Sequence, residues 1–203
     1  MFYRPGIDPH GLPHNPFKAL VTPRPIGWIS TLDAEGRANL APYSFFNAVA
    51  DAPPMVIYAN NGRKTGVAEG KDTLANVRAT GEFVANIVGS EMRDAMNVSS
   101  ASWAAGEDEF RKAGVVPAPC EIVAAPRVAG APAALECRLW RIVELPGADN
   151  HLVIGEVVGI HVDDAVIVDG KVDVTTYRPL ARLGYRDYCA VTEVFTLTRP
   201  DDG

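Results

Sequence analysis

The stretch RPIGWISTLDAEGRANLAPYSFFNAV, residues 24–49, decides the fold of this chain. Residues 26–32 are mostly apolar, residues 33–37 form the polar sequence DAEGR, and residues 38–42 resume an extended path. A glycine near the end of a short polar turn between two such runs is typical of a β-hairpin. The stretch therefore predicts two antiparallel strands that lead into an aromatic segment.

Further β-rich segments continue along the chain and dominate its second half. Strands are predicted at residues 55–59, 82–88, 134–145 and 151–162, and at residues 166–168 and 172–174 on either side of Asp169-Gly170. Many strands and few helices favour a closed or nearly closed barrel, because closure removes exposed strand edges. The predicted fold class is therefore mainly β, a β-barrel with a few short helices.

The clearest helix covers residues 73–80, which Asp72 or Thr73 can cap and Gly81 can end. Two shorter helical segments are expected at residues 91–97 and 107–113. Residues 1–25 contain six prolines and predict an extended arm or wrapping loop, since proline blocks helix interiors and central strand pairing. With 203 residues and no linker, we expect one domain over residues 1–203.

Composition excludes several classes of protein. The net charge is −6 without a run of lysines or arginines, so binding to nucleic acid or to an anionic membrane surface is not expected. The N-terminus lacks an apolar stretch of signal-peptide length, and no apolar run approaches the roughly 20 residues of a membrane helix. The three cysteines do not form a CxxC motif and predict buried or incidental thiols. These features indicate a cytoplasmic protein.

Common catalytic and metal-binding motifs are missing. The chain has no GxGxxG after a strand, no phosphate-binding GxxxxGK[ST] and no GxSxG. His10 and His14 are four residues apart, but Gly11-Leu12-Pro13 between them is a poor helix, so loop histidines are favoured over a metal pair. His161 lies in an apolar β-run and is expected to be a hydrogen-bonded core or interface histidine. No metal site is predicted.

The first candidate binding cluster lies within residues 24–49. Trp28, Phe45 and Phe46 can form a flat apolar wall, and Asn47 offers a donor and an acceptor for the polar edge of a flavin ring. The hydroxyl residues Ser30, Thr31 and Ser44 stand where the two strands end or bend. A hairpin followed by an aromatic core segment is the alternative interpretation, and the residues alone favour it.

The second candidate cluster is Lys71-Asp72-Thr73, directly before the predicted helix. Free backbone N–H groups and the positive end of the helix dipole make a helix N-terminus suitable for phosphate. Lys71 adds a positive charge and Thr73 a hydroxyl, whereas Asp72 is better suited to capping the helix or orienting Lys71. An ordinary capped helix is the alternative.

Taken together, these blocks resemble the flavin reductase-like proteins with an FMN-binding split β-barrel. The strongest matches are RPIGWISTLDAEGRANLAPYSFFNAV (24–49), KDTLANVRATGEFVANIV (71–88) and Met96-Asn97. Weaker matches are GEDEFRKAG (106–114), EVVGIHVDD (156–164) and RPLARLGYRDY (178–188). The order and spacing of the blocks carry the resemblance, which covers most of the chain beyond the N-terminal arm.

The resemblance implies a Greek-key-like split barrel that forms a homodimer, with FMN near the subunit interface. The cofactor-binding residues it implies are Ser30, Thr31, Ser44, Phe45, Phe46, Asn47, Lys71, Asp72 and Thr73. Arg182 is a weaker candidate, because Tyr185 stands where the family pattern has a second glycine after Gly184. That departure puts the local turn and the role of Arg182 in doubt.

The activity implied by the resemblance is electron transfer from NAD(P)H to flavin. No catalytic residue is predicted, because the cofactors carry out hydride transfer while the protein supplies orientation and electrostatics. Three alternatives remain open: a non-catalytic FMN electron carrier, a split-barrel oxidase of a small organic substrate, and a barrel that binds no flavin and mediates interactions. A small-molecule electron donor or acceptor is the expected partner.

Overall fold

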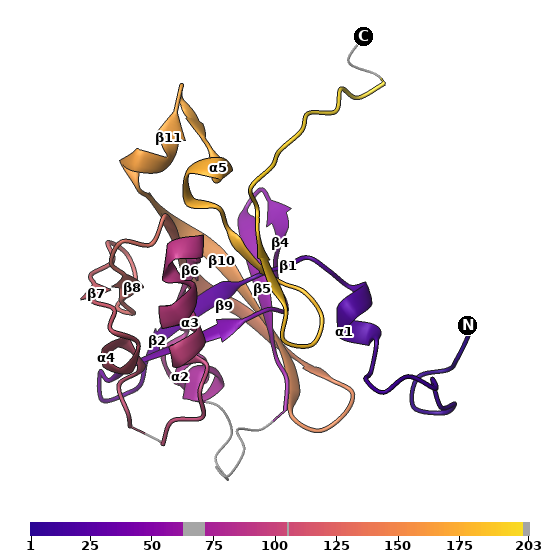
Figure 1. Ribbon diagram of the computed structural model, residues 1–203. Coiled ribbons are helices and arrows are strands. Elements are labelled where there is room, and N and C mark those ends of the chain that lie inside the picture. The colour runs from indigo at the N-terminus through magenta and orange to yellow at the C-terminus, as the bar shows by residue number, and fades with distance from the viewer. Residues whose placement is uncertain (63–71, 105, 201–203) are drawn as a thin grey trace.

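The computed structural model describes residues 1–62, 72–104 and 106–200. Seven strands build its main sheet: β2 (Gly27–Leu32), β3 (Ala38–Tyr43), β4 (Phe46–Asp51), β5 (Pro54–Asn60), β6 (Glu82–Ile87), β9 (Ala133–Leu145) and β10 (Asn150–Val162). The sheet is antiparallel and has the strand order β3-β2-β6-β9-β10-β5-β4 (Figure 1). The prediction of a mainly β fold is confirmed, and β2 and β3 form the predicted hairpin.

The outer strands β3 and β4 are consecutive in the chain, although they lie at opposite ends of the sheet order. Only Ser44 and Phe45 separate the end of β3 at Tyr43 from the start of β4 at Phe46. In the described residues β3 and β4 do not pair with each other, and the Phe45 carbonyl accepts a hydrogen bond from the N–H of Ala59 at 2.8 Å. The sheet therefore curls into a barrel that stays split at this corner.

Three smaller sheets complete the β-structure. They contain β1 (Arg24–Pro25), β13 (Leu180–Arg182) and β14 (Tyr188–Ala190); β7 (Pro117–Ala118) and β8 (Arg127–Val128); and β11 (Ile167–Val168) and β12 (Lys171–Val172). Asp169 and Gly170 turn between β11 and β12 with φ values of 50° and 75°, as their sequence predicts. The second strand of this hairpin is shorter than predicted, because residue 174 already begins a helix.

Short helices lie outside the main sheet (Figure 1). They are α1 (Phe17–Leu20), α2 (Asp72–Thr80), α3 (Arg93–Ser99), α4 (Glu109–Ala113) and α5 (Val174–Tyr177), with 3₁₀ turns η1 (Ser90–Met92) and η2 (Asp164–Val166). Gly81 ends α2 as predicted, with a φ of 72° and an N–H that donates to the Val77 carbonyl at 3.0 Å. The arm is not wholly extended, since α1 begins directly after Pro16, a position where proline is tolerated.

The core divides between the two faces of the sheet. Successive side chains of a strand point to opposite faces, so Ile29 joins one cluster and Trp28 the other. Leu74 and Val77 of α2 pack into the first cluster, and residues of α3 and α4 pack into the second. No helix in the described part of the chain is long and apolar enough to cross a bilayer.

Candidate functional site

A cavity of about 360 Å³ lies at the corner where β3 passes into β4. Its volume is in the range of small-molecule sites. The described lining residues come from the N-terminal arm, from β3 and the 44–45 link, and from Ala59 of β5 and Asn61. The others come from the start of α2, from the end of α3 with the segment that follows it, and from α4. The cavity therefore joins parts of the chain that are far apart in sequence.

Aromatic rings form one wall of this cavity. Phe45 and Tyr43 line it, and the Tyr43 ring packs against the buried ring of Tyr58 with centroids 4.7 Å apart. The Tyr43 hydroxyl donates to Asn60 Oδ1 at 3.3 Å. Burial raises the pKa of Tyr43 far more than the neighbouring Thr73 hydroxyl lowers it. Tyr43 thus remains a neutral, fixed hydrogen-bonding wall residue.

The N-terminal end of α2 forms the polar wall. Asp72 and Thr73 line the cavity, and Thr73 Oγ1 accepts a hydrogen bond from Asn39 Nδ2 at 2.9 Å. Behind them, Thr31 Oγ1 accepts from Asn76 Nδ2 at 3.0 Å. This buried network fixes α2 against the β2–β3 hairpin. Thr73 also hydrogen-bonds the Tyr43 side chain, which lowers the pKa of Tyr43, so its hydroxyl would exchange this partner for a ligand.

The end of α3 and the segment that follows it add further hydroxyls. Ser99, Ser100 and Ser102 line the cavity. Ser99 Oγ donates to the Met96 carbonyl at 2.7 Å and accepts from Trp28 Nε1 at 2.8 Å, which ties this wall to the core. Sequence analysis assigned no site residue to this segment, although three serines within Ser99 to Ser102 are a signal of a polar wall.

Sequence analysis also missed lining residues from other elements, among them Lys18, Asn39 and Glu109. Glu109 is buried in α4, and its Oε2 accepts from the Leu40 N–H at 3.4 Å. These three residues are separated from one another by more than 20 positions, so no local pattern marks them.

Among the predicted site residues, the cavity gathers Ser44, Phe45, Asp72 and Thr73. The predicted phosphate-binding Lys71 lies outside the described residues. The structure therefore brings together parts of both predicted clusters. A role of these residues in cofactor binding stays a prediction.

The other predicted residues do not line the cavity. Ser30 is fully buried, and its Oγ donates to the Pro126 carbonyl at 2.5 Å. Thr31 supports the cavity wall from behind, through Asn76. Phe46 packs into the core, as does the proposed wall residue Trp28. Asn47 is exposed on β4, where its own Oδ1 accepts from the N–H of residue 48 at 3.0 Å.

Arg182, the weaker candidate, lies on β13 outside the cavity lining. Its guanidinium stacks on the Tyr188 ring, 4.4 Å from the centroid, and donates to the Tyr188 hydroxyl and the Tyr185 carbonyl. Tyr185 has a φ of 55°, the left-handed conformation that favours glycine. The tyrosine therefore adopts the backbone conformation that the missing glycine would favour.

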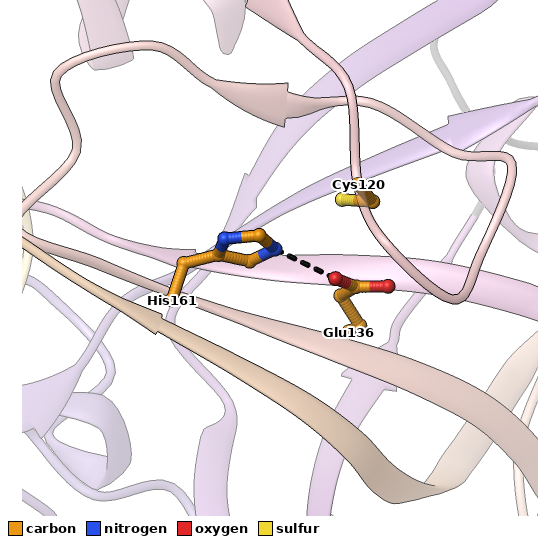
Figure 2. A group of neighbouring side chains, drawn as sticks. All are labelled: Cys120, Glu136 and His161. Carbon is orange, nitrogen blue, oxygen red and sulfur yellow. Dashed lines mark hydrogen bonds and ion pairs between the residues drawn. The ribbon is translucent and has the colours of Figure 1, made fainter.

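A second cluster of titratable groups lies away from the cavity. Figure 2 shows His161 of β10 pointing its Nε2 at Glu136 of β9, with Cys120 on a loop beside them. The Nε2–Oε1 distance is 2.6 Å. His161 is thus hydrogen-bonded, as predicted.

Glu136 also holds the loop that passes over it. Its carboxylate accepts from the N–H groups of Glu121, Ile122 and Val123 at 2.7–2.9 Å. Burial raises the pKa of Glu136, but these donors and His161 outweigh burial and lower it to about 2. Burial and the Glu136 charge raise the pKa of the Cys120 thiol to about 11.

The three ligand atoms lie within 4.8 Å of one another, a spacing that could suit a metal ion. However, both Glu136 oxygens already accept two hydrogen bonds each, which fills their lone pairs. A metal ion would have to displace these donors and deprotonate Cys120. The arrangement is that of a buried carboxylate that holds a loop on the sheet.

Comparison with known proteins decides the family. The model of the flavin reductase-like domain matches residues 20–180. The chain belongs to the flavin reductase-like family. The resemblance inferred from the sequence is thereby confirmed.

Relatives of this flavin reductase-like protein include an uncharacterised Aquifex aeolicus protein, 39% identical over 83% of this chain and 85% of the relative. Nitrilotriacetate monooxygenase component B from Bacillus cereus is 31% identical with a TM-score of 0.88, covering 97% of this chain and 98% of that one. The 2-nitrobenzoate 2-nitroreductase of Pseudomonas fluorescens is 31% identical with a TM-score of 0.79, covering 91% and 88%.

The split barrel is confirmed by a Shewanella frigidimarina protein described as a flavin reductase with a split barrel domain. Its TM-score is 0.79 at 24% identity, over 90% of this chain and 89% of that one. At this identity the likeness concerns the fold alone.

Proposed function

We propose that this protein binds FMN in the cavity at the β3–β4 corner and reduces it with a nicotinamide dinucleotide. The observation that carries the proposal is the meeting, in one cavity, of the Phe45 and Tyr43 rings with the N-terminal end of α2. A flat apolar wall suits a flavin ring, and a helix N-terminus suits a phosphate. Membership of the flavin reductase-like family supports the same cofactor.

The donor set of the cavity fits FMN. Phe45 would cover the ring, Ser44 and Asn61 offer groups for its polar edge, and Thr73 offers a hydroxyl to the phosphate. Lys71 is the predicted counter-charge. The buried network behind Thr73 would hold its hydroxyl in place and lower the entropy lost on binding.

Bound FMN would supply the redox chemistry, a two-electron transfer from a dihydronicotinamide to an acceptor. The protein would orient the cofactor and exclude water from the cavity wall. Tyr43 keeps its hydroxyl proton because burial raises its pKa, and it donates that proton to Asn60, so it would form a neutral wall beside the cofactor. No residue needs to exchange a proton with the nicotinamide.

The direct test is the absorbance spectrum of the purified protein, before and after anaerobic addition of NADH or NADPH. We expect a yellow flavin spectrum that bleaches with at least one donor. A bound yellow chromophore that neither donor bleaches would contradict the reductase assignment and favour an electron carrier. A colourless protein that does not take up added FMN would contradict cofactor binding itself.

Transfer of the electrons to a small organic molecule is the second candidate. It is favoured by the 31% identity to the 2-nitrobenzoate 2-nitroreductase. Anaerobic reoxidation of the reduced protein by 2-nitrobenzoate, faster than by free flavin, would support it.

Replacing Thr73 with valine is expected to weaken FMN binding about tenfold, because a lost charge-assisted hydrogen bond costs roughly 1.5 kcal/mol. Valine preserves the shape of the side chain. Equilibrium titration of flavin fluorescence measures the effect. Thr80→Val, at the other end of α2, is the control, and equal FMN affinity of the two variants would remove Thr73 from the phosphate site.

We also propose that the protein is a homodimer. The segment 191–200 runs away from the body as extended chain, and its Val194, Phe195 and Leu197 are exposed (Figure 1). Exposed apolar residues gathered in one segment are typical of a contact surface. We expect light scattering to give twice the chain mass of 21.7 kDa. A monomer with full FMN content would contradict the dimer.

A further inference from the structure

Two cationic side chains lie by the Phe45 ring at the edge of the cavity, and a third lies next to one of them on the neighbouring strand. The Lys18 ammonium lies 6.0 Å from the centroid of the Phe45 ring, and the Arg24 guanidinium lies 5.6 Å from it. Arg182 is the direct cross-strand partner of Arg24 in the β1–β13 pair. Residues from the arm, β1 and β13 thus place their charges together; we call Lys18, Arg24 and Arg182 the cation cluster.

The backbone around the cation cluster is tightly built. Arg24 donates to the carbonyls of Lys18, Val21 and Leu183, the last at 2.7 Å. A Cβ on Gly184 would stand 2.4 Å from the Cβ of Ala19, so α1 packs directly on the turn that follows β13. The arm is therefore held at the cavity by Arg24, and Lys18 is held with it.

Hydrogen bonds to carbonyls explain how Arg24 is held, but they do not neutralise the cluster. In the described part of the chain, none of its three members forms an ion pair with a carboxylate. Elsewhere, Arg4 pairs with Asp8 at 2.8 Å and Arg37 with Asp33 at 2.6 Å. A protein with a net charge of −6 thus leaves three positive charges together beside its candidate site.

Arg24, the buried member of the cation cluster, is destabilised by its surroundings. Arg24 is 7% exposed, and its Nε has no hydrogen-bond partner. Burial, and then the charge of Arg182, lower the pKa of Arg24. A nearby anion would relieve this repulsion, since buried charges are stabilised by opposite charge.

The position of the cluster indicates which anion it would meet. Lys18 is exposed and lines the cavity, Arg182 is half-buried outside the lining, and Arg24 is buried behind them. An anion near all three therefore lies at the rim of the cavity, beside the ring wall of Phe45. A reactant that approaches the flavin from outside would place its charged part there.

We propose that Lys18 and Arg182, supported by the buried charge of Arg24, bind the phosphates of the dihydronicotinamide dinucleotide that reduces the flavin. This inference rests on the proposed function. The two linked phosphates of the dinucleotide match two accessible cations, and the Arg182 guanidinium, which already donates to Tyr188 and Tyr185, has further N–H donors for a phosphate. The cluster would then hold the donor without contributing to hydride transfer.

The test compares Lys18→Gln with Lys171→Gln, an exposed lysine on the distant hairpin strand β12. For the FMN-loaded proteins, calorimetry measures binding of NAD⁺, which needs no turnover, and flavin fluorescence measures FMN affinity. Stopped-flow absorbance then measures flavin reduction by NADH and by dihydronicotinamide riboside, which has no phosphate. Because Lys18 is exposed, its replacement should not unfold the protein, so a change in binding reports the lost charge.

We expect Lys18→Gln to weaken NAD⁺ binding and to raise the half-saturating NADH concentration about tenfold, as for a lost charge-assisted bond. Reduction by the riboside and FMN affinity should match those of Lys171→Gln. If Lys18→Gln leaves NAD⁺ binding and the NADH dependence unchanged, the inference is overturned. Flavin reduction by the riboside would still support the proposed function in that case. Weaker FMN binding alone would also overturn it and assign the cluster to the flavin phosphate. No flavin reduction by either donor in the unmodified protein would overturn both.

Discussion

Replacing Glu136 with glutamine is expected to lower the free energy of unfolding by about 3 kcal/mol, because buried N–H donors would lose their charged acceptor. The carboxylate is 1% exposed and accepts from three consecutive backbone N–H groups and from His161. Glutamine has nearly the same shape, but its NH₂ group would face N–H donors and could not accept from them. The loop above β9 would lose its attachment.

Urea denaturation at neutral pH measures this effect. Glu144→Gln is the matched control, because Glu144 lies on the same strand and is exposed. Its free energy of unfolding should remain within about 0.5 kcal/mol of the unmodified protein. Equal stability of the two variants would show that the Glu136 carboxylate does not hold the loop.

The same carboxylate predicts how stability depends on pH. Its pKa is about 2 in the folded protein, below its ordinary value of 4.5, so its contribution is complete above pH 4.5 and is lost as the pH falls towards 2. The difference between these pKa values corresponds to about 3 kcal/mol. Stability of Glu136→Gln should therefore fall less steeply over this acidic range than that of the unmodified protein.

The second large effect is expected for Gly155→Ala, with a loss of about 2–3 kcal/mol from overpacking. A Cβ at this position in β10 would stand 2.4 Å from Cζ of Phe83 and 3.3 Å from Cβ of Cys137. The Phe83 ring is fully buried and packs edge-on against Tyr58, with centroids 5.4 Å apart. Tyr58 in turn supports Tyr43, so the displacement should also weaken FMN binding.

Thermal or urea unfolding checks the prediction, and a double-mutant cycle identifies its cause. Phe83→Leu removes the far ring atoms, so the double variant Gly155→Ala/Phe83→Leu should lose less stability than the sum of the single variants. Additive losses would show that contact with Phe83 is not the source. Gly155→Ala with unchanged stability would mean that the ring moves at no cost.

Local signals were sufficient to predict the elements that frame the cavity. The β2–β3 hairpin and α2 were predicted because turn residues, caps and a terminal glycine act within a few positions. Helix α1 was not predicted, since four residues after a proline carry little helical signal. Family resemblance supplied the split of the barrel, which depends on how distant strands meet.

The cavity lining shows where sequence reasoning stops. Ser30 and Thr31 are adjacent and were both assigned to the flavin, yet strand alternation sends them to opposite faces of the sheet. Because side chains alternate between the faces of a strand, the sequence alone indicates that at most one of the two faces a given ligand. Lys18 and Glu109 reach the cavity through tertiary packing, which no local pattern encodes.

Whether Glu136 and His161 meet depends on the register of the β9–β10 pair. Gly159 of β10 lies opposite Glu136, and His161 stands two residues further along the same strand, a diagonal cross-strand neighbour. The sequence predicted both strands, but a shift of one residue would have placed the two side chains on opposite faces. Bulges in the β9–β10 pair set the actual register.

The two-residue link between β3 and β4 also limits how far the barrel can open. Three residue steps from Tyr43 to Phe46 span at most about 11 Å when fully extended, so the two sheet edges are tethered at this corner. A ligand of the cavity therefore cannot enter or leave by separation of these two strands. The aperture of the site must instead be set by segments that are not part of the sheet, and inserting one residue beside Ser44 would be the most direct way to enlarge it.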